Sequence, residues 1–145
     1  MLSIFLAVLV APNIAAAPSA ACLAGKRQAL VDGRFTGPLV CSKNNATFKL
    51  VGRPRGSEYA VYDYHYRFLP HPGGVFHGGQ KLVVFRGGKY VGQYALSPPP
   101  YTSLSVSGSD IVLQSPASHE KVRLDLAKGP PATLMFNGEK EVFHR

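Results

Sequence analysis

Glycine and proline interrupt this chain so often that no apolar run after the first residues is long. The sequence contains 15 glycines and 12 prolines, and the runs between them lack the 3.6-residue periodicity of an amphipathic helix. Proline breaks a helix and glycine weakens one, so such short segments favour strands joined by turns. The sequence therefore predicts an all-β fold, with no helix outside the first 21 residues.

The clearest strand pattern lies in residues 59–68, YAVYDYHYRF. Side chains in a strand point alternately to the two faces of a sheet, which divides this segment into two sets. The more aromatic set is expected to face the core, and it consists of Ala60, Tyr62, Tyr64, Tyr66 and Phe68. The other face carries Tyr59, Val61, Asp63, His65 and Arg67.

Turn chemistry predicts three hairpins. Residues 81–86 and 89–96 flank Gly87-Gly88, which suits a two-residue turn with positive φ angles. Similar pairs are expected for residues 104–106 with 111–113, and for residues 133–136 with 141–143 around Asn137-Gly138. Residues 119–126 supply one more alternating strand.

Strands joined in order by tight turns form a meander. We expect about eight short strands in a small antiparallel sheet that closes into a barrel or packs as a two-layer sandwich. The run Pro98-Pro99-Pro100 cannot join a ladder, so it is expected to cross between sheets or turn a corner. Residues 22–145 are enough for one domain and too few for two separate cores.

The first 21 residues predict export. An uncharged apolar segment, residues 4–10, precedes Ser19-Ala20-Ala21, which are small residues of the kind found at signal-peptidase sites. Cleavage after Ala21 would release residues 22–145 into the periplasm or the extracellular space. The apolar stretch is interrupted by Pro12 and is shorter than the roughly 20 residues of a membrane span. We therefore expect no transmembrane helix in the mature chain. A buried core helix is the alternative for this segment.

The chain has two cysteines, Cys22 and Cys41. In an oxidising compartment they are expected to form a disulfide, which would stabilise the fold by about 3 kcal/mol. The alternative is that Cys22 becomes the new N-terminus and carries a lipid that tethers the domain to a membrane. Ser19 stands where a lipoprotein signal has leucine, so the disulfide is the favoured prediction.

Charge is distributed unevenly. The formal net charge is +8, and from Cys22 to Lys89 there are 11 basic residues against three acids, whereas the remainder balances five against five. A basic half can attract lipid head groups, lipopolysaccharide, acidic polysaccharide or a protein partner, and export makes nucleic acid the least expected of the anions. Plain solubility is the simpler reading. The predicted anion-binding residues are Lys26, Arg27, Arg34, Lys43, Lys49, Arg53 and Arg55.

A second hypothesis rests on three evenly spaced histidines, His65, His71 and His77, in a segment rich in glycine and proline. Imidazole is a common ligand of zinc and copper, and a flexible loop can fold back on its strand. Asp63 or Glu58 can add a carboxylate. The spacing differs from the short His pairs of most zinc sites, and histidines that only decorate a loop are the simpler reading.

Catalysis has no sequence support, because the chain contains no nucleophile-elbow motif and no free Cys–His pair. We expect no cofactor and no enzyme activity. The favoured hypothesis is an exported, non-catalytic binding or envelope-associated module whose basic half contacts an anionic partner. The alternatives are the histidine-loop metal protein and a small hydrolase or hydrolase inhibitor.

Overall fold

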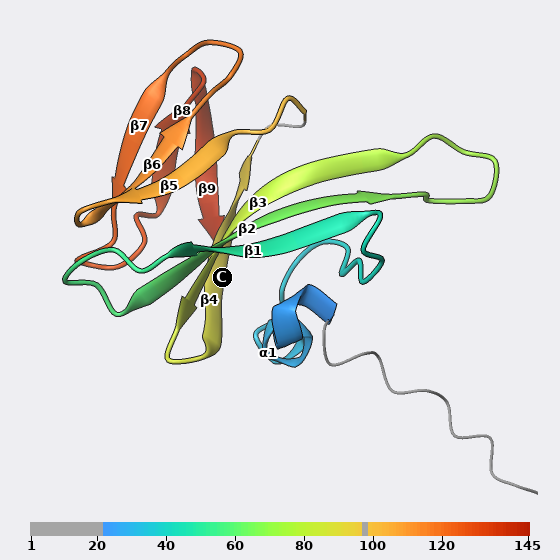
Figure 1. The fold of residues 1–145 in the computed structure, drawn as a ribbon, viewed down its shortest axis with the longest axis horizontal. Helices are drawn as coiled ribbons and strands as arrows, with labels where there is room; N and C mark the ends of the chain where they lie inside the picture. The colour runs from blue at the N-terminus through green and yellow to red at the C-terminus, as the bar shows by residue number, and fades with distance from the viewer. Residues whose placement is uncertain (1–21, 97–98) are drawn as a thin grey trace, which may run out of the picture.

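A computed structural model describes residues 22–96 and 99–145, and it confirms the all-β class (Figure 1). A 3-10 turn, Cys22–Gly25, and one short helix, α1 (Arg27–Asp32), precede the strands. The nine strands are β1 (Ala46–Gly52), β2 (Tyr59–Phe68), β3 (His77–Arg86), β4 (Lys89–Leu96), β5 (Ser103–Ser107), β6 (Asp110–Gln114), β7 (Lys121–Asp125), β8 (Thr133–Phe136) and β9 (Glu139–His144). The predicted leader, residues 1–21, lies outside the described residues.

The strands form two antiparallel sheets rather than one continuous meander. The main sheet has the order β1-β2-β3-β4-β9-β8, and the second sheet has the order β5-β6-β7. The chain therefore leaves the main sheet after β4, builds the second sheet, and returns as β8 and β9, where β9 pairs with β4. The segment that contains Pro98-Pro99-Pro100 joins the two sheets, as expected, although Pro98 is outside the described residues. The two sheets pack as a sandwich, and the described strands do not close into a barrel.

Both faces of the main sheet are buried, which corrects the expectation of one core face on β2. Val61, Leu82 and Tyr94 belong to a core that lies between the main sheet and the second sheet. Tyr62 and Tyr64 belong to a second core beneath residues 22–41, which we call the N-terminal segment. The prediction for Tyr62 and Tyr64 was right about burial, but Phe68 and Tyr66, on the same face, are only half-buried, with Tyr66 packed against the margin of the second core.

The N-terminal segment supplies the cover for the second core. Helix α1 was not predicted, because its six residues are too few to show a periodic apolar face, and its Leu30 is fully buried against the sheet. The predicted disulfide between Cys22 and Cys41 is present and ties the two ends of this segment together. Its sulfur atoms are bonded to each other, so Cys22 in this state cannot carry a thioether lipid.

The three predicted hairpins are confirmed. Arg86 pairs with Lys89 across Gly87-Gly88, whose φ angles of 55° and 77° are left-handed values that favour glycine. The β8–β9 turn uses Asn137-Gly138 in the same way, with φ angles of 54° and 73°.

One end of the main sheet, which we call the cleft end, carries the β1–β2 loop, the β3–β4 turn and the end of β9. The other, which we call the tip end, carries the β2–β3 loop, residues 69–76. This assignment follows from antiparallel pairing of β1 to β4 and of β4 with β9. In residues 22–96 and 99–145, no helix has the length and hydropathy needed to cross a membrane.

Candidate functional site

A basic cleft lies at the cleft end of the main sheet. Arg86 and Lys89 flank the β3–β4 turn, Lys128 comes from the connection between β7 and β8, and Arg145 follows β9. Their side chains line a cleft of about 460 Å³ together with Tyr59 and Tyr90. Segments that lie far apart in the sequence thus contribute the four cations. The pairing of β9 with β4 and the return of the chain through β8 bring them together.

Within the described part of the chain, no carboxylate forms an ion pair with these four cations. Among the described residues, the only ion pairs within 4.0 Å are Asp63 with His65 and Asp110 with Arg123, and neither includes a cleft residue. Acids do lie in the neighbourhood: Asp32 lines an adjoining pocket with Lys89, Glu58 precedes β2, and Asp125 is three residues before Lys128. Four exposed cations around one hollow create a positive potential that a bound anion would relieve.

Tyr59 and Tyr90 form one side of the cleft. Tyr90 is nearly fully buried, and its ring contacts Phe35 and Phe85 edge-on, with centroid separations of 5.7 and 6.1 Å. Burial raises the pKa of Tyr90 to about 12, so its phenol stays neutral at physiological pH. The Arg86 guanidinium lies 5.8 Å from the centre of the Tyr59 ring, which restrains this cation near the cleft.

The cleft has the size and chemistry to hold a small polyanion. Ligand pockets of about 300–1,000 Å³ are typical of small-molecule sites. The planar guanidinium of arginine binds phosphate, sulfate or carboxylate groups in a bidentate way, and lysine adds a mobile point charge. The arrangement therefore suits a ligand with at least two anionic groups.

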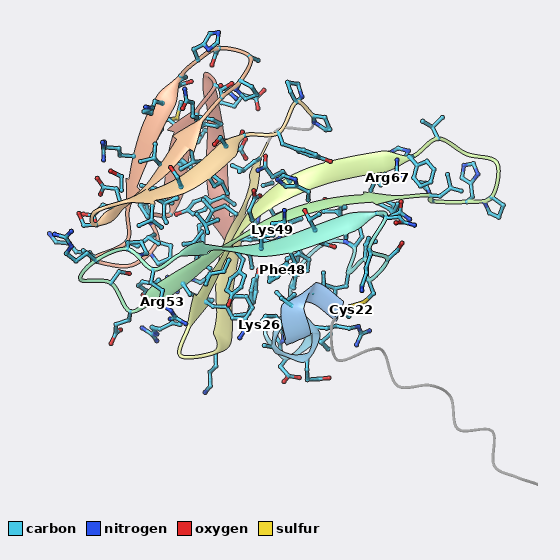
Figure 2. All side chains as sticks on the ribbon, in the orientation of Figure 1. Cys22, Lys26, Phe48, Lys49, Arg53 and Arg67 are labelled. Carbon is cyan, nitrogen blue, oxygen red and sulfur yellow. A yellow bond between two sulfur atoms is a disulfide. The ribbon has the colours of Figure 1, made fainter. Side chains whose placement is uncertain are left out.

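The seven basic residues predicted from the sequence do not gather at this cleft. Lys26, Arg27 and Arg34 belong to the N-terminal segment, where the Lys26 ammonium lies 5.8 Å from the centre of the Phe85 ring. Lys43, Lys49, Arg53 and Arg55 follow the edge strand β1 and its flanking loops. Figure 2 shows Arg53 and Arg67 toward opposite ends of the main sheet.

The predicted residues also lie on both faces of the sheet. Phe48 packs toward the N-terminal segment, so its neighbour Lys49 points to the opposite face. Arg53 and Arg55, in the β1–β2 loop, lie at the cleft end and extend its positive charge. The seven residues predicted to form one diffuse patch thus lie in separate groups.

Sequence reasoning missed Lys128 and Arg145 because they belong to the half of the chain whose charges balance. Arg86 and Lys89 had a usable signal, since they flank the predicted glycine turn. No sequence pattern indicated that β9 returns to β4, and that non-sequential pairing places Arg145 beside them.

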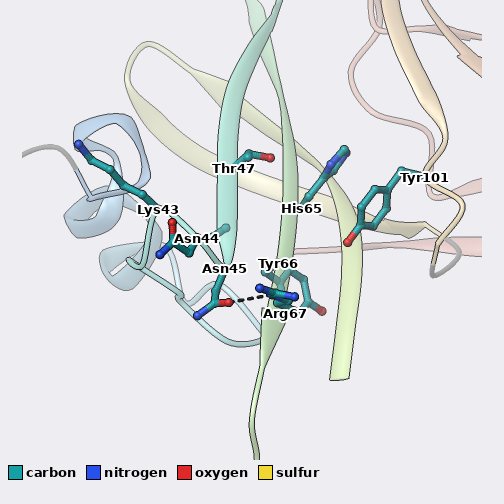
Figure 3. A pocket seen from close by; sticks show the side chains of 9 residues that line it. Lys43, Asn44, Asn45, Thr47, His65, Tyr66, Arg67 and Tyr101 are labelled. Atoms are coloured by element: carbon teal, nitrogen blue, oxygen red, sulfur yellow. Dashed lines mark hydrogen bonds between the residues drawn. The ribbon is translucent and has the colours of Figure 1, made fainter. Parts of the chain in front are cut away.

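A second hollow lies nearer the tip end, between β1, β2 and Tyr101 (Figure 3). It has a volume of about 180 Å³, and Thr47, His65 and Arg67 line it. The His65 ring stacks on Tyr101 with centroids 4.0 Å apart. His65 Nε2 lies 2.9 Å from Asp63 Oδ1 but makes no well-directed hydrogen bond. The hollow is smaller than the cleft and mixes amide, hydroxyl and imidazole groups.

The three histidines of the metal hypothesis are not gathered. His65 stacks on Tyr101, whereas His77 lies beside Phe68 on the other face of the sheet, with centroids 5.8 Å apart. His71 lies in the exposed β2–β3 loop. No group of three or more metal-ligating side chains occurs in the part of the chain that the structure describes. Metal binding by these histidines stays a prediction without support from their placement.

Comparison with known proteins gives no independent guide to the site. No family model matches the chain, and no curated protein or solved structure shows significant similarity to it.

Proposed function

We propose that this protein is an exported binding protein that holds an anionic partner in the basic cleft. One observation carries the proposal: four cations from separate segments line a single hollow without a carboxylate within ion-pair distance in the described residues. Solubility alone requires charges spread over a surface, and it does not require them to converge. The convergence supports a dedicated site.

Export is supported by two features. The first 21 residues have the pattern of a secretory leader, and the disulfide between Cys22 and Cys41 is of the kind that persists in oxidising compartments. Acidic and sulfated glycans, and phosphorylated envelope components, are the polyanions of such compartments. The partner we propose is an anionic envelope or extracellular component that reaches the cleft with two or more charged groups.

Calorimetric titration with a heparin-derived hexasaccharide tests the proposal. The probe should bind, and raising the salt concentration should weaken binding because the contacts are ionic. The double variant K128Q/R145Q should lose roughly tenfold or more in affinity, as each charged contact contributes about 1 kcal/mol or more.

A matched control separates the site from net charge. The double variant K121Q/K140Q removes the same charge from exposed residues that do not line the cleft. It should keep its affinity within about threefold, because screening limits the reach of a surface charge to about 10 Å. Equal losses in both variants would show that only net charge matters, and absence of binding by the wild-type protein would reject the proposal.

A further inference from the structure

The tip end of the main sheet carries an exposed apolar loop. Strands β2 and β3 are ladder partners from Tyr59 and Arg86 to Phe68 and His77, and they carry the loop of residues 69–76 well beyond the second sheet (Figure 1). Within this loop Val75 is 78% exposed, Phe76 is 52% exposed and Leu69 is 41% exposed. These three apolar side chains lie in one projecting loop, and their exposure to water is unfavourable in free energy.

The surroundings of this tip are positively charged. From residue 64 to residue 109 the sequence contains no aspartate or glutamate. Arg67 is exposed at the base of the tip, with its guanidinium carbon 5.0 Å from the centre of the Phe76 ring and its Nε donating to Asn45 Oδ1 at 2.8 Å. Lys43 lines the neighbouring hollow with Arg67. The apolar tip is thus followed, toward the sheet, by Arg67 and Lys43, and Asp63, the next acid along β2, lies further inward beside His65.

The backbone of the loop is suited to leaving water. Pro70 and Pro72 have no N–H group to desolvate. The Gly74 N–H donates to the His71 carbonyl oxygen at 3.1 Å, so one further donor is paired within the loop. An unpaired backbone donor is expensive in a bilayer, and this loop reduces their number.

Aromatic rings occupy the level below the tip. Tyr66, Phe68 and His77 follow one another along one face, with centroid separations of 6.4 Å and 5.8 Å. Of these, Tyr66 combines an apolar ring with a polar hydroxyl, which is the kind of side chain enriched where a bilayer meets water. From the apex inward, the hairpin therefore carries His71, Pro72 and two glycines, then the apolar side chains of Leu69, Val75 and Phe76, and then the rings and Arg67.

We propose that the tip of the β2–β3 hairpin inserts into the surface of an anionic lipid bilayer. The exposed apolar side chains suit the acyl region and the rings suit the interface, while Arg67 and Lys43 complement the head groups of phosphatidylglycerol or similar lipids. A protein partner fits less well, since a specific interface buries about 800 Å² per partner and this tip is a narrow projection with three large apolar side chains.

Insertion leaves the basic cleft free. The cleft lies at the opposite end of β3, and ten residues of strand separate the two ends by about 30 Å. A protein attached by its tip would present the cleft away from the membrane. The tip and the cleft are separate sites for different ligands, so membrane insertion and anion binding in the cleft can each be disproved without the other.

Tryptophan fluorescence tests insertion directly, because the chain contains no tryptophan. The variant Phe76→Trp should shift its emission to shorter wavelength on addition of vesicles of phosphatidylcholine mixed with phosphatidylglycerol. Met135→Trp, at a residue of β8 that is 58% exposed, should show no shift. Absence of a shift for Phe76→Trp would overturn the proposal, and so would equal shifts in both variants.

Vesicle sedimentation provides a second measurement without a new ring. The wild-type protein should sediment with the mixed vesicles, and V75S/F76S should lose roughly tenfold or more of its vesicle affinity. The control M135S/V142S alters two apolar side chains that are exposed elsewhere and should bind as the wild type does. Wild-type protein that stays in the supernatant, or equal losses in the two variants, would contradict insertion. Equal binding to vesicles of phosphatidylcholine alone would exclude the anionic preference.

Discussion

Gln80 and Thr102 join the two sheets through a pair of hydrogen bonds. The Gln80 amide donates to the Thr102 carbonyl oxygen at 2.7 Å, and the Thr102 N–H donates to Gln80 Oε1 at 2.8 Å. Both residues are buried. The side-chain amide thus pairs with the backbone as a neighbouring strand would, at the point where the chain has crossed from β4 toward β5. The same amide group donates to Asp63 Oδ1 at 2.9 Å.

Replacing this amide should destabilise the sandwich. Gln80→Leu leaves the Thr102 N–H and carbonyl buried without partners, so we expect the free energy of unfolding to fall by about 2–4 kcal/mol. Urea denaturation measures this loss. Gln114→Leu, at an exposed glutamine of β6, should change it by less than about 0.5 kcal/mol. Similar effects at the two residues would show that the Gln80–Thr102 pair does not hold the sheets together.

The disulfide should stabilise the cover of the second core. Cys22 and Cys41 are 19 residues apart in sequence, and closing such a loop contributes about 3 kcal/mol on the chain-entropy model. The variant C22S/C41S should lose that amount of stability, and a protease should cut its residues 22–41 faster than those of the wild type. Unchanged stability and unchanged cleavage would mean that packing of Leu30 and its neighbours holds the segment without the bond.

Tyr64 fastens the same segment and makes it sensitive to alkaline pH. Its hydroxyl donates to the Pro38 carbonyl oxygen at 2.8 Å and accepts from the Val40 N–H at 2.9 Å. Burial raises the pKa of Tyr64 to about 12, so the native state favours the neutral phenol. This contribution is fully present below the unfolded pKa of about 10 and is lost as the pH rises through about 12.

Tyr64→Phe should therefore separate two effects. At neutral pH the variant should be less stable by about 1–2 kcal/mol, because the Pro38 and Val40 groups lose their partner. Between about pH 10 and pH 12 its stability should fall less steeply than that of the wild type, although buried Tyr90 and Tyr94 keep part of the slope. Urea midpoints across this range measure both effects, and identical slopes would refute the role of Tyr64 in the alkaline transition.

Local chemistry made the hairpins predictable. Gly87-Gly88 and Asn137-Gly138 allow only a few turn geometries, and the flanking alternation fixed which residues are strands. Helix α1 escaped prediction because six residues are stabilised here by packing of Leu30 and by the disulfide rather than by an intrinsic pattern.

The sequence alone did not predict which strands pair across long separations in the chain. Alternation in β2 separates two faces but does not say that both are covered, although the unbroken apolar run of residues 82–85 is a sign of a strand buried on both sides. The cleft depends on β9 pairing with β4 across the inserted second sheet, so the approach of Arg145 to Arg86 has no local signature.

Titration of the isotope-labelled protein with the heparin-derived hexasaccharide, followed by amide NMR, tests the cleft most directly. We predict that the amides of Lys89, Tyr90, Lys128 and Gly129 shift together with increasing probe concentration, because these residues line the cleft. The amides of Lys43 and Thr47, in the hollow nearer the tip end, should stay in place. Shifts confined to Lys43 and Thr47, or no shifts at all, would contradict an anion-binding cleft at this end of the sheet.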